Sequence, residues 1–466
     1  MSQTVRYVGD PFVDAGVAVL EHWLEKGCEE FTTADLRGAA SRLTQEYAKK
    51  IWKGYLTVHL PNSVWCNPNK KITEEKRRQA RGKVLAGFDY TPLSPHRPCL
   101  YCGRPGQVIA DRSQVPLVTS KTSMSVGPGG APGAPVCGYC LYAIQFYPLC
   151  TLKVGPKPLF WAAPEPRWTF MLSGSFLRIV EQVTGGATEK FESLRWPSTL
   201  LLRSASEVVE VWSRGPSAER PSFCDIVGCH ATNFGTEADY EELRIPKALL
   251  EFWAEAGSFG PLYSQIVDHA WVDDTRKTGG KRAQSAVAAW NRRNLLYQAL
   301  GEAFRETEFE VPAKRIAARF FLKPWRDSPP RHLFDLTSYF LEKVAGMERA
   351  RLEAIRGIAD RIAEKVKEKR IERDLFANNM GLSQLLNYFA RLQKMLAEAG
   401  APLSWDEVLL ALGISNVEDR TSRDHWLVQD LILIRVYEQL GQSAAEAELP
   451  NLEPMEKDVA PEEPVK

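Results

Sequence analysis

The chain has 466 residues, of which 44% are hydrophobic and 25% charged, and its formal net charge is +1. This composition is typical of a globular protein with more than one packed core. No run approaches the roughly 18–20 apolar residues that a membrane-spanning helix needs, and residues 1–10 lack a secretion signal. We therefore expect a cytoplasmic protein with no membrane partner, in which the nine cysteines are metal ligands and buried thiols and not disulfides.

The first segment, 1–95, is predicted to be an α+β region. Apolar residues at helical spacing predict helices across 11–53, the first of them capped by Asp10 or Asp14. Alternating and β-branched residues predict a strand across 55–65.

Basic side chains dominate residues 42–83, with eleven Lys or Arg and three acids. Such a run is either a solvated helix face or a surface that contacts phosphate. Interleaved aromatic residues either stack on bases or are buried, and these are Trp52, Tyr55 and Trp65. The densest part of the run supplies candidate nucleic-acid contacts, namely Lys70, Lys71, Arg77, Arg78 and Arg81.

Two CxxC pairs, Cys99–Cys102 and Cys137–Cys140, are separated by 34 residues in the segment 96–150. Each CxxC turn presents two thiolates, and two such turns complete a closed four-sulfur shell for Zn²⁺. The sequence therefore predicts a four-cysteine zinc module with a structural role. The alternatives are a redox dithiol, four incidental thiols and a catalytic zinc. Four protein ligands leave no open position for the water that a catalytic zinc needs.

The loop between the two pairs is rich in glycine and proline over residues 126–133. It is either a linker within the module or a loop whose backbone can approach a ligand closely. Lys121, just before it, is a candidate nucleic-acid contact.

The segment 151–330 is predicted to be a mixed α/β region with basic loops. Residues 276–293 contain six basic side chains and no acid, which favours nucleic-acid binding. These candidates are Arg276, Lys277, Lys281, Arg282, Arg292 and Arg293. A second metal site at Cys224, Cys229 and His230 is an alternative without a recognised spacing.

Residues 331–445 are predicted to form a helical bundle, followed by a disordered acidic tail, 446–466. Apolar stripes at helical spacing begin at Leu352 and Leu385, and Ser404 with Glu407 has the pattern of a capping box. The expected fold class is thus α+β, with a mixed N-terminal region, an inserted four-cysteine zinc module and a C-terminal helical bundle.

Three features together resemble a known family: the block from Gly9 to Gly16 (GDPFVDAG), the paired CxxC motifs, and a basic middle followed by helices. The chain resembles the CRISPR-associated CXXC-CXXC family, the large subunits of type I (I-B-like) Cascade surveillance complexes. The resemblance implies a non-catalytic subunit that lies beside the 5′ end of the guide RNA and contacts other Cascade subunits. It also implies recognition of the protospacer-adjacent motif in double-stranded target DNA and support for R-loop formation. It further implies recruitment of a nuclease-helicase or, in some transposons, of transposition proteins.

The resemblance implies no list of DNA-reading residues, so the basic candidates above come from composition alone. Two other functions remain open: a zinc-dependent nuclease or hydrolase, and a free-standing zinc-ribbon DNA-binding protein. The sequence has no P-loop, nucleophile elbow or His-Glu-x-x-His helix. We therefore expect that the chain is not an enzyme.

Overall fold

The computed structural model describes most of the chain. The described residues are 4–66, 73–89, 91–93, 97–118, 134–185, 191–215, 222–232, 239–272, 290–305, 311–325, 329–367, 380–398, 400–414 and 424–440. They divide into two compact units: residues before Ala248 together with 290–292, and Ala248–Val272 together with residues from Arg293 onward. The five predicted segments stay predictions, and the predicted tail 446–466 lies outside the described residues.

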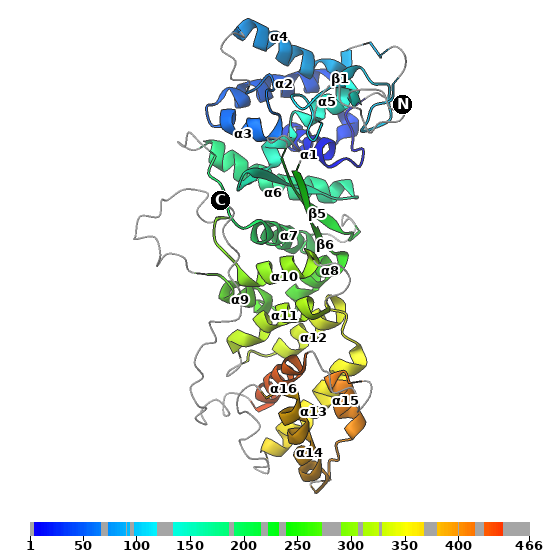
Figure 1. The fold of residues 1–466 in the computed structure, drawn as a ribbon, viewed down its shortest axis with the longest axis vertical. Helices are drawn as coiled ribbons and strands as arrows, with labels where there is room; N and C mark the ends of the chain where they lie inside the picture. Colours follow the sequence, from blue (N-terminus) through cyan, green and yellow to red (C-terminus); the bar gives the residue numbers. More distant parts are fainter. Residues whose placement is uncertain are drawn as a thin grey trace, which may run out of the picture. The chain divides into compact units, whose positions relative to one another are not determined.

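The first unit mixes helices with two small antiparallel sheets, which confirms the predicted α+β class (Figure 1). Its helices are α1 (Pro11–Leu24), α2 (Thr33–Ala48), α3 (Trp52–His59), α4 (Glu74–Leu85), α5 (Gly138–Ile144), α6 (Pro166–Gly185) and α7 (Pro197–Ser213), with 3-10 turns η1 (Cys28–Glu30), η2 (Gly87–Asp89) and η3 (Tyr147–Cys150). Its strands are β1 (Val108–Ala110), β2 (Ala134–Val136), β3 (Leu152–Val154), β4 (Lys157–Ala162), β5 (Ile226–Thr232) and β6 (Asp239–Ile245).

The larger sheet has the strand order β3-β4-β5-β6, with every neighbouring pair antiparallel. Helix α6 packs against β4, and α7 supplies Leu201, whose Cδ1 would lie 2.3 Å from a Cβ at Gly228 of β5. The smaller sheet pairs β1 with β2 and pairs Val108 with Val136.

The block from Gly9 to Gly16 forms the start of α1. Asp10 is the N-cap and accepts hydrogen bonds from the amides of Phe12 and Val13, both at 3.0 Å. The other candidate cap, Asp14, is buried inside the helix and accepts the amides of Val8 at 2.7 Å and Gly9 at 3.0 Å. Asp10 therefore caps the first turn of α1, and Asp14 ties the preceding residues to the helix.

The predicted strand across 55–65 is wrong. Residues 52–59 form α3, because Trp52, Tyr55, Leu56 and His59 recur at three- and four-residue spacing and are all buried on one face. The short alternation seen in the sequence is also compatible with this helical spacing. The side chains of Tyr55 and His59 both lie within hydrogen-bond distance of Thr151, and this packing against the core favours the helix.

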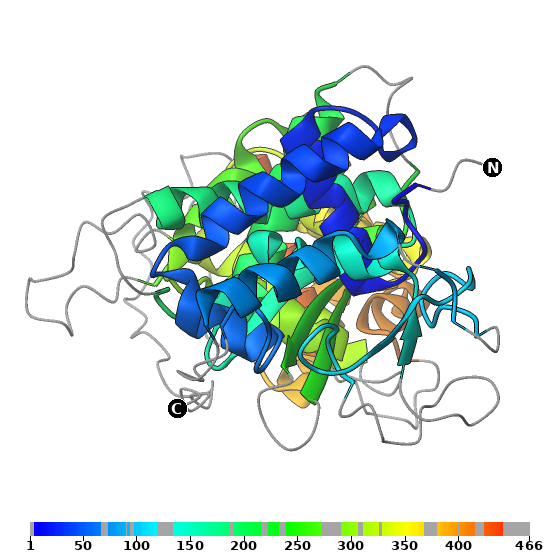
Figure 2. The same ribbon diagram turned by 90° about the horizontal axis from the view of Figure 1, so that it is seen from above.

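The described residues of the second unit are helical, without a strand. Its helices are α8 (Lys247–Ala256, which starts at the boundary), α9 (Leu262–His269), α10 (Leu295–Arg305), α11 (Val311–Leu322), α12 (Leu333–Lys343), α13 (Arg349–Lys367), α14 (Leu382–Glu398), α15 (Trp405–Leu412) and α16 (His425–Leu440), with 3-10 turns η5 (Gly257–Phe259) and η8 (Lys323–Trp325). Figure 2 shows the ribbon of the chain after a turn of 90° about the horizontal axis of Figure 1.

Helix α13 packs against α12, α15 and α16 through the predicted apolar stripe, of which Leu352, Ile355 and Ile362 are buried. The predicted capping box is present, with Ser404 and Glu407 bonded reciprocally. No helix in the described ranges is long and apolar enough to cross a membrane.

Candidate metal centre and nucleic-acid surface

The first CxxC pair lies on a tight loop before β1. The amide of Gly103 donates to the carbonyl of Cys99 at 3.0 Å, which closes the turn that holds Cys99 and Cys102. Gly103 has φ +71°, a left-handed conformation that favours glycine. The loop is anchored because the Leu100 amide donates to the carbonyl of Pro135 at 2.9 Å.

The second pair lies where β2 ends and α5 begins. Cys137 is the N-cap of α5, and its sulfur accepts the amide of Cys140 at 3.5 Å. The Gly138 amide donates to Oε1 of Gln107 at 2.7 Å, so the β1 side of the module also holds the first turn of the helix. The β1–β2 pairing thereby brings the two CxxC motifs together.

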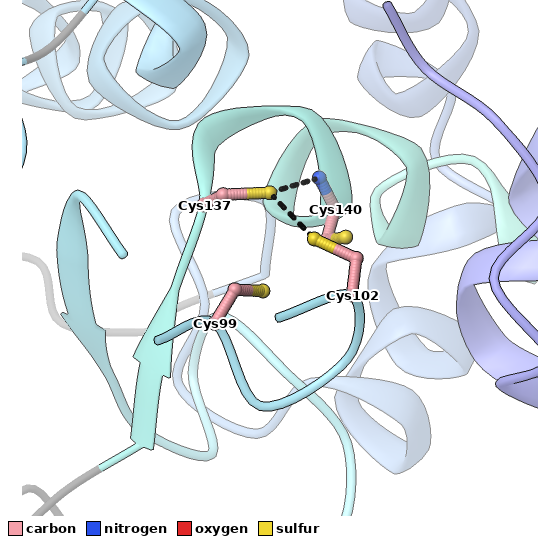
Figure 3. A group of neighbouring side chains, drawn as sticks. All are labelled: Cys99, Cys102, Cys137 and Cys140. Atoms are coloured by element: carbon pink, nitrogen blue, oxygen red, sulfur yellow. Dashed lines mark hydrogen bonds between the residues drawn. The ribbon is translucent and has the colours of Figure 1, made fainter. Parts of the chain in front are cut away.

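The four sulfurs of Cys99, Cys102, Cys137 and Cys140 all lie within 4.8 Å of one another (Figure 3). The Sγ atoms of Cys102 and Cys137 are 3.5 Å apart. Tetrahedral thiolates at zinc, with Zn–S near 2.3 Å, would be about 3.8 Å apart. The four thiols are therefore grouped closely enough to hold one metal ion.

The cluster is mostly enclosed, with Cys99, Cys137 and Cys140 buried and Cys102 half-buried. Hydrogen bonds with the three neighbouring thiols lower the pKa of the Cys102 thiol far below its usual range. Hydrogen bonding to Cys102 raises the pKa values of Cys137 and Cys140. Because four thiolates repel one another, full ionisation requires a cation that replaces the shared protons.

One neighbour of this cluster, Arg104, was not predicted from the sequence. Its Nε donates to Cys102 Sγ at 3.3 Å and its Nη1 donates to the Thr4 carbonyl at 2.9 Å. The guanidinium also lies 5.1 Å from the ring centroid of Tyr139. Arg104 thus offsets the negative charge of the thiolates and ties the N-terminal segment to the module. The sequence signal for this role is an arginine directly after Gly103, the glycine that follows the first CxxC pair.

The module is joined to the core of the first unit through α5. A Cβ at Gly16 of α1 would lie 1.9 Å from the carbonyl oxygen of Ala143, so only glycine permits this approach of α1 and α5. The Tyr142 hydroxyl donates to the Leu36 carbonyl of α2 at 2.6 Å. The helix that starts at Cys137, a candidate metal ligand, is therefore a central element of the unit.

The predicted nucleic-acid contacts Arg77, Arg78 and Arg81 lie on α4. Arg78 pairs with Glu75 at 2.5 Å, and Arg81 pairs with Glu74 at 2.9 Å. Arg81 also lies 5.7 Å from the ring centroid of Trp65, which is itself only 6% exposed. The aromatic residues Trp52, Tyr55 and Trp65 are buried in the core, so they do not stack on bases.

The remaining candidates are scattered. Arg292 is exposed, Arg293 is half-buried and bonded to Oε1 of Gln298, and the unit boundary passes between the two arginines. The other predicted contacts and the glycine-rich loop lie outside the described residues; these are Lys70, Lys71, Lys121, Arg276, Lys277, Lys281, Arg282 and 126–133.

The alternative metal site at Cys224, Cys229 and His230 does not assemble. Cys229 and His230 are neighbours on β5, and strand geometry turns them to opposite faces. Cys229 Sγ lies 3.3 Å from the Tyr240 hydroxyl, whereas His230 lies within hydrogen-bond distance of the Val154 carbonyl at 3.0 Å.

Comparison of the chain with protein-family models, curated proteins and solved structures finds no match.

Proposed function

We propose that this chain is the large subunit of a CRISPR RNA-guided surveillance complex of the Cascade type. In this role it is a non-catalytic, cytoplasmic subunit that contacts the guide RNA, the double-stranded target DNA and the other Cascade subunits. It recognises the protospacer-adjacent motif, supports R-loop formation and recruits a nuclease-helicase or transposition proteins.

The observation that carries this proposal is the contact between the two motifs of the resemblance. The block from Gly9 to Gly16 and the paired CxxC motifs are far apart in the sequence. In the structure Gly16 lies against Ala143, in the helix that begins at Cys137. The elements that carry the two motifs, α1 and α5, therefore pack directly against each other, which supports treating the motifs as one signature.

The proposed metal is Zn²⁺, because zinc is bound tetrahedrally by four cysteine sulfurs in structural sites. All four positions are supplied by protein sulfurs, three of them from buried residues. A closed shell of this kind leaves no position for a reacting water, which supports a structural role. The zinc-dependent nuclease or hydrolase has no such support in the described residues.

Proposed nucleic-acid contacts come from the basic residues of α4 and from Arg292 and Arg293. In RNA-guided complexes the guide reads the sequence by base pairing, while protein reads the adjacent motif and holds the strands electrostatically. A subunit with local basic surfaces and a net charge of only +1 is compatible with these separate roles of guide RNA and protein.

The experiment compares the purified metal-loaded chain with the reconstituted complex, using the same labelled DNA duplex at several salt concentrations. We expect weak binding and no cleavage by the chain alone, and tight binding only within the complex and only for duplexes that match the guide. Tight guide-independent binding by the chain alone would instead identify a free-standing zinc-ribbon protein. Metal-dependent cleavage by the chain alone would identify a nuclease.

A further inference from the structure

Helix α4 buries few of its side chains. Only Val84 and Leu85, at its C-terminal end, are buried among its twelve residues. Its first two turns carry mainly polar side chains, and Arg81 in the following turn lies over the ring of Trp65. A helix this short is marginal in water, and a polar helix of this kind is usually stabilised by ion pairs or by a partner.

The acids of α4 are fewer than its basic side chains. Its two acids, Glu74 and Glu75, are each paired with an arginine of the same helix. The helix has five basic residues and two acids, a net charge of +3 (5 − 2). Lys76 and Lys83 are exposed and seven residues apart, so they lie on the same side of the helix about 10.5 Å apart along its axis.

Gly82 lies beside this basic side of the helix. A Cβ there would meet nothing within 4 Å, so packing within the unit does not require glycine. Alanine is the better helix former at such a position. A bare backbone at an exposed position permits the close approach of another backbone.

We propose that the α4 face, defined by Lys76, Gln79, Gly82 and Lys83, docks against the phosphate backbone of the target-DNA duplex. This inference rests on the proposed function and assigns a surface to it. The charge of the face is complementary to phosphate, and α-helices fit against the major groove and its rims.

A duplex suits this face better than a single strand. Surfaces that bind single strands stack bases on exposed aromatic side chains. Near α4, Trp65 is buried and its Nε1 donates to Oε1 of Gln145 at 2.9 Å, so it is held inside the unit. Trp52 and Tyr55 are 0% and 2% exposed.

The metal module holds this face in place. Helix α4 packs against α5 and η2, and a Cβ at Gly87 would lie 3.3 Å from the Cα of Gly138, next to Cys137. The C-terminal end of α4 is thereby fixed to the helix that begins at the metal ligands, and its basic face is left toward solvent.

The test uses the purified guide-containing complex and a labelled target duplex at several salt concentrations. The variant Lys76→Gln/Lys83→Gln is compared with a control variant, Arg391→Gln/Lys394→Gln on α14. The control also removes two positive charges from exposed positions. We expect the α4 variant to weaken binding on the order of tenfold and to reduce the salt slope by about two, since each lost phosphate contact removes about one. The α14 variant should keep both values.

Equal affinity and salt slope for the α4 variant and the unmodified complex would overturn the α4 proposal while leaving the proposed function intact. An equal loss in the α14 variant would also overturn it, because the effect would then be one of total charge. A preparation that holds no guide RNA would overturn both proposals. The guide content is therefore measured in every preparation.

Discussion

A Cβ at Gly16 would lie 1.9 Å from the carbonyl oxygen of Ala143, which places the backbones of α1 and α5 in direct contact. Helix α5 begins at Cys137, so this contact connects the N-terminal block to the four-cysteine cluster. The stability of the first unit should therefore depend both on this contact and on the four-cysteine cluster.

Gly16→Ala should destabilise the first unit by about 2–3 kcal/mol, because the added methyl forces α1 and α5 apart. Gly38→Ala is the matched control: Gly38 is exposed on α2 and a Cβ there meets nothing within 4 Å. The control should be neutral or slightly stabilising, since alanine favours helix. Urea unfolding followed by tryptophan fluorescence measures both. Equal stability of the two variants would contradict the packing described.

Cys102→Ser should abolish stoichiometric metal binding, which we expect at about one ion per chain. Cys224→Ser is the control, because Cys224 lies outside the four-thiol cluster. Metal content by mass spectrometry, and the visible spectrum after Co²⁺ substitution, report the site directly. Full metal content in the Cys102 variant would show that the cluster does not bind metal through four thiolates.

Acid should destabilise the first unit through His59. Its Nε2 lies 2.8 Å from Thr151 Oγ1, and burial lowers the pKa of His59 to about 3. Because the folded pKa lies below the unfolded value near 6.5, the stabilisation is complete above about pH 6.5 and is lost as the pH falls toward 3. Between pH 6.5 and 5 this amounts to about 2 kcal/mol.

The measurement is the free energy of unfolding at pH 7.5 and pH 5 for the unmodified chain and for His59→Gln, each metal-loaded. The variant lacks the titrating group, so its stability should change less with pH. Metal loss affects both proteins alike and cancels in the comparison. An equal pH dependence would contradict a neutral, buried His59.

Asp424→Asn should destabilise the second unit by about 3–5 kcal/mol, because it leaves two guanidiniums without their shared carboxylate. Asp424 accepts hydrogen bonds from Arg351 at 2.8 and 3.1 Å and from Arg315. Arg349→Ala removes an exposed pair with Glu353 and should cost less than about 1 kcal/mol. Thermal unfolding measures the stability of both variants. An effect of Asp424→Asn below about 1 kcal/mol would show that Arg315 and Arg351 do not depend on the Asp424 carboxylate.

The sequence was sufficient to predict features with short-range signals. The spacing of the four cysteines predicted the cluster, and Ser404 with Glu407 predicted the start of α15. The helical stripe that includes Ile355 was likewise visible, because its period of 3.6 extends over several turns.

Features that depend on tertiary contacts could not be predicted. The strand predicted across 55–65 is wrong because a helix of eight residues leaves too short a pattern to separate the two periods. The unit boundary after Lys247 lies in the first turn of α8, so Pro246 just before it indicates the start of a helix as well as a boundary. The role of Arg104 depends on a fold that brings Thr4 and Cys102 together.

Membership of an RNA-guided complex can be measured by purification of the tagged chain from cells that express its native neighbouring genes. Copurified proteins are identified by mass spectrometry and copurified RNA is sequenced. We predict RNA of uniform length with repeat-derived ends, together with several CRISPR-associated subunits. A chain that purifies alone and without RNA would show that it is not a subunit of such a complex.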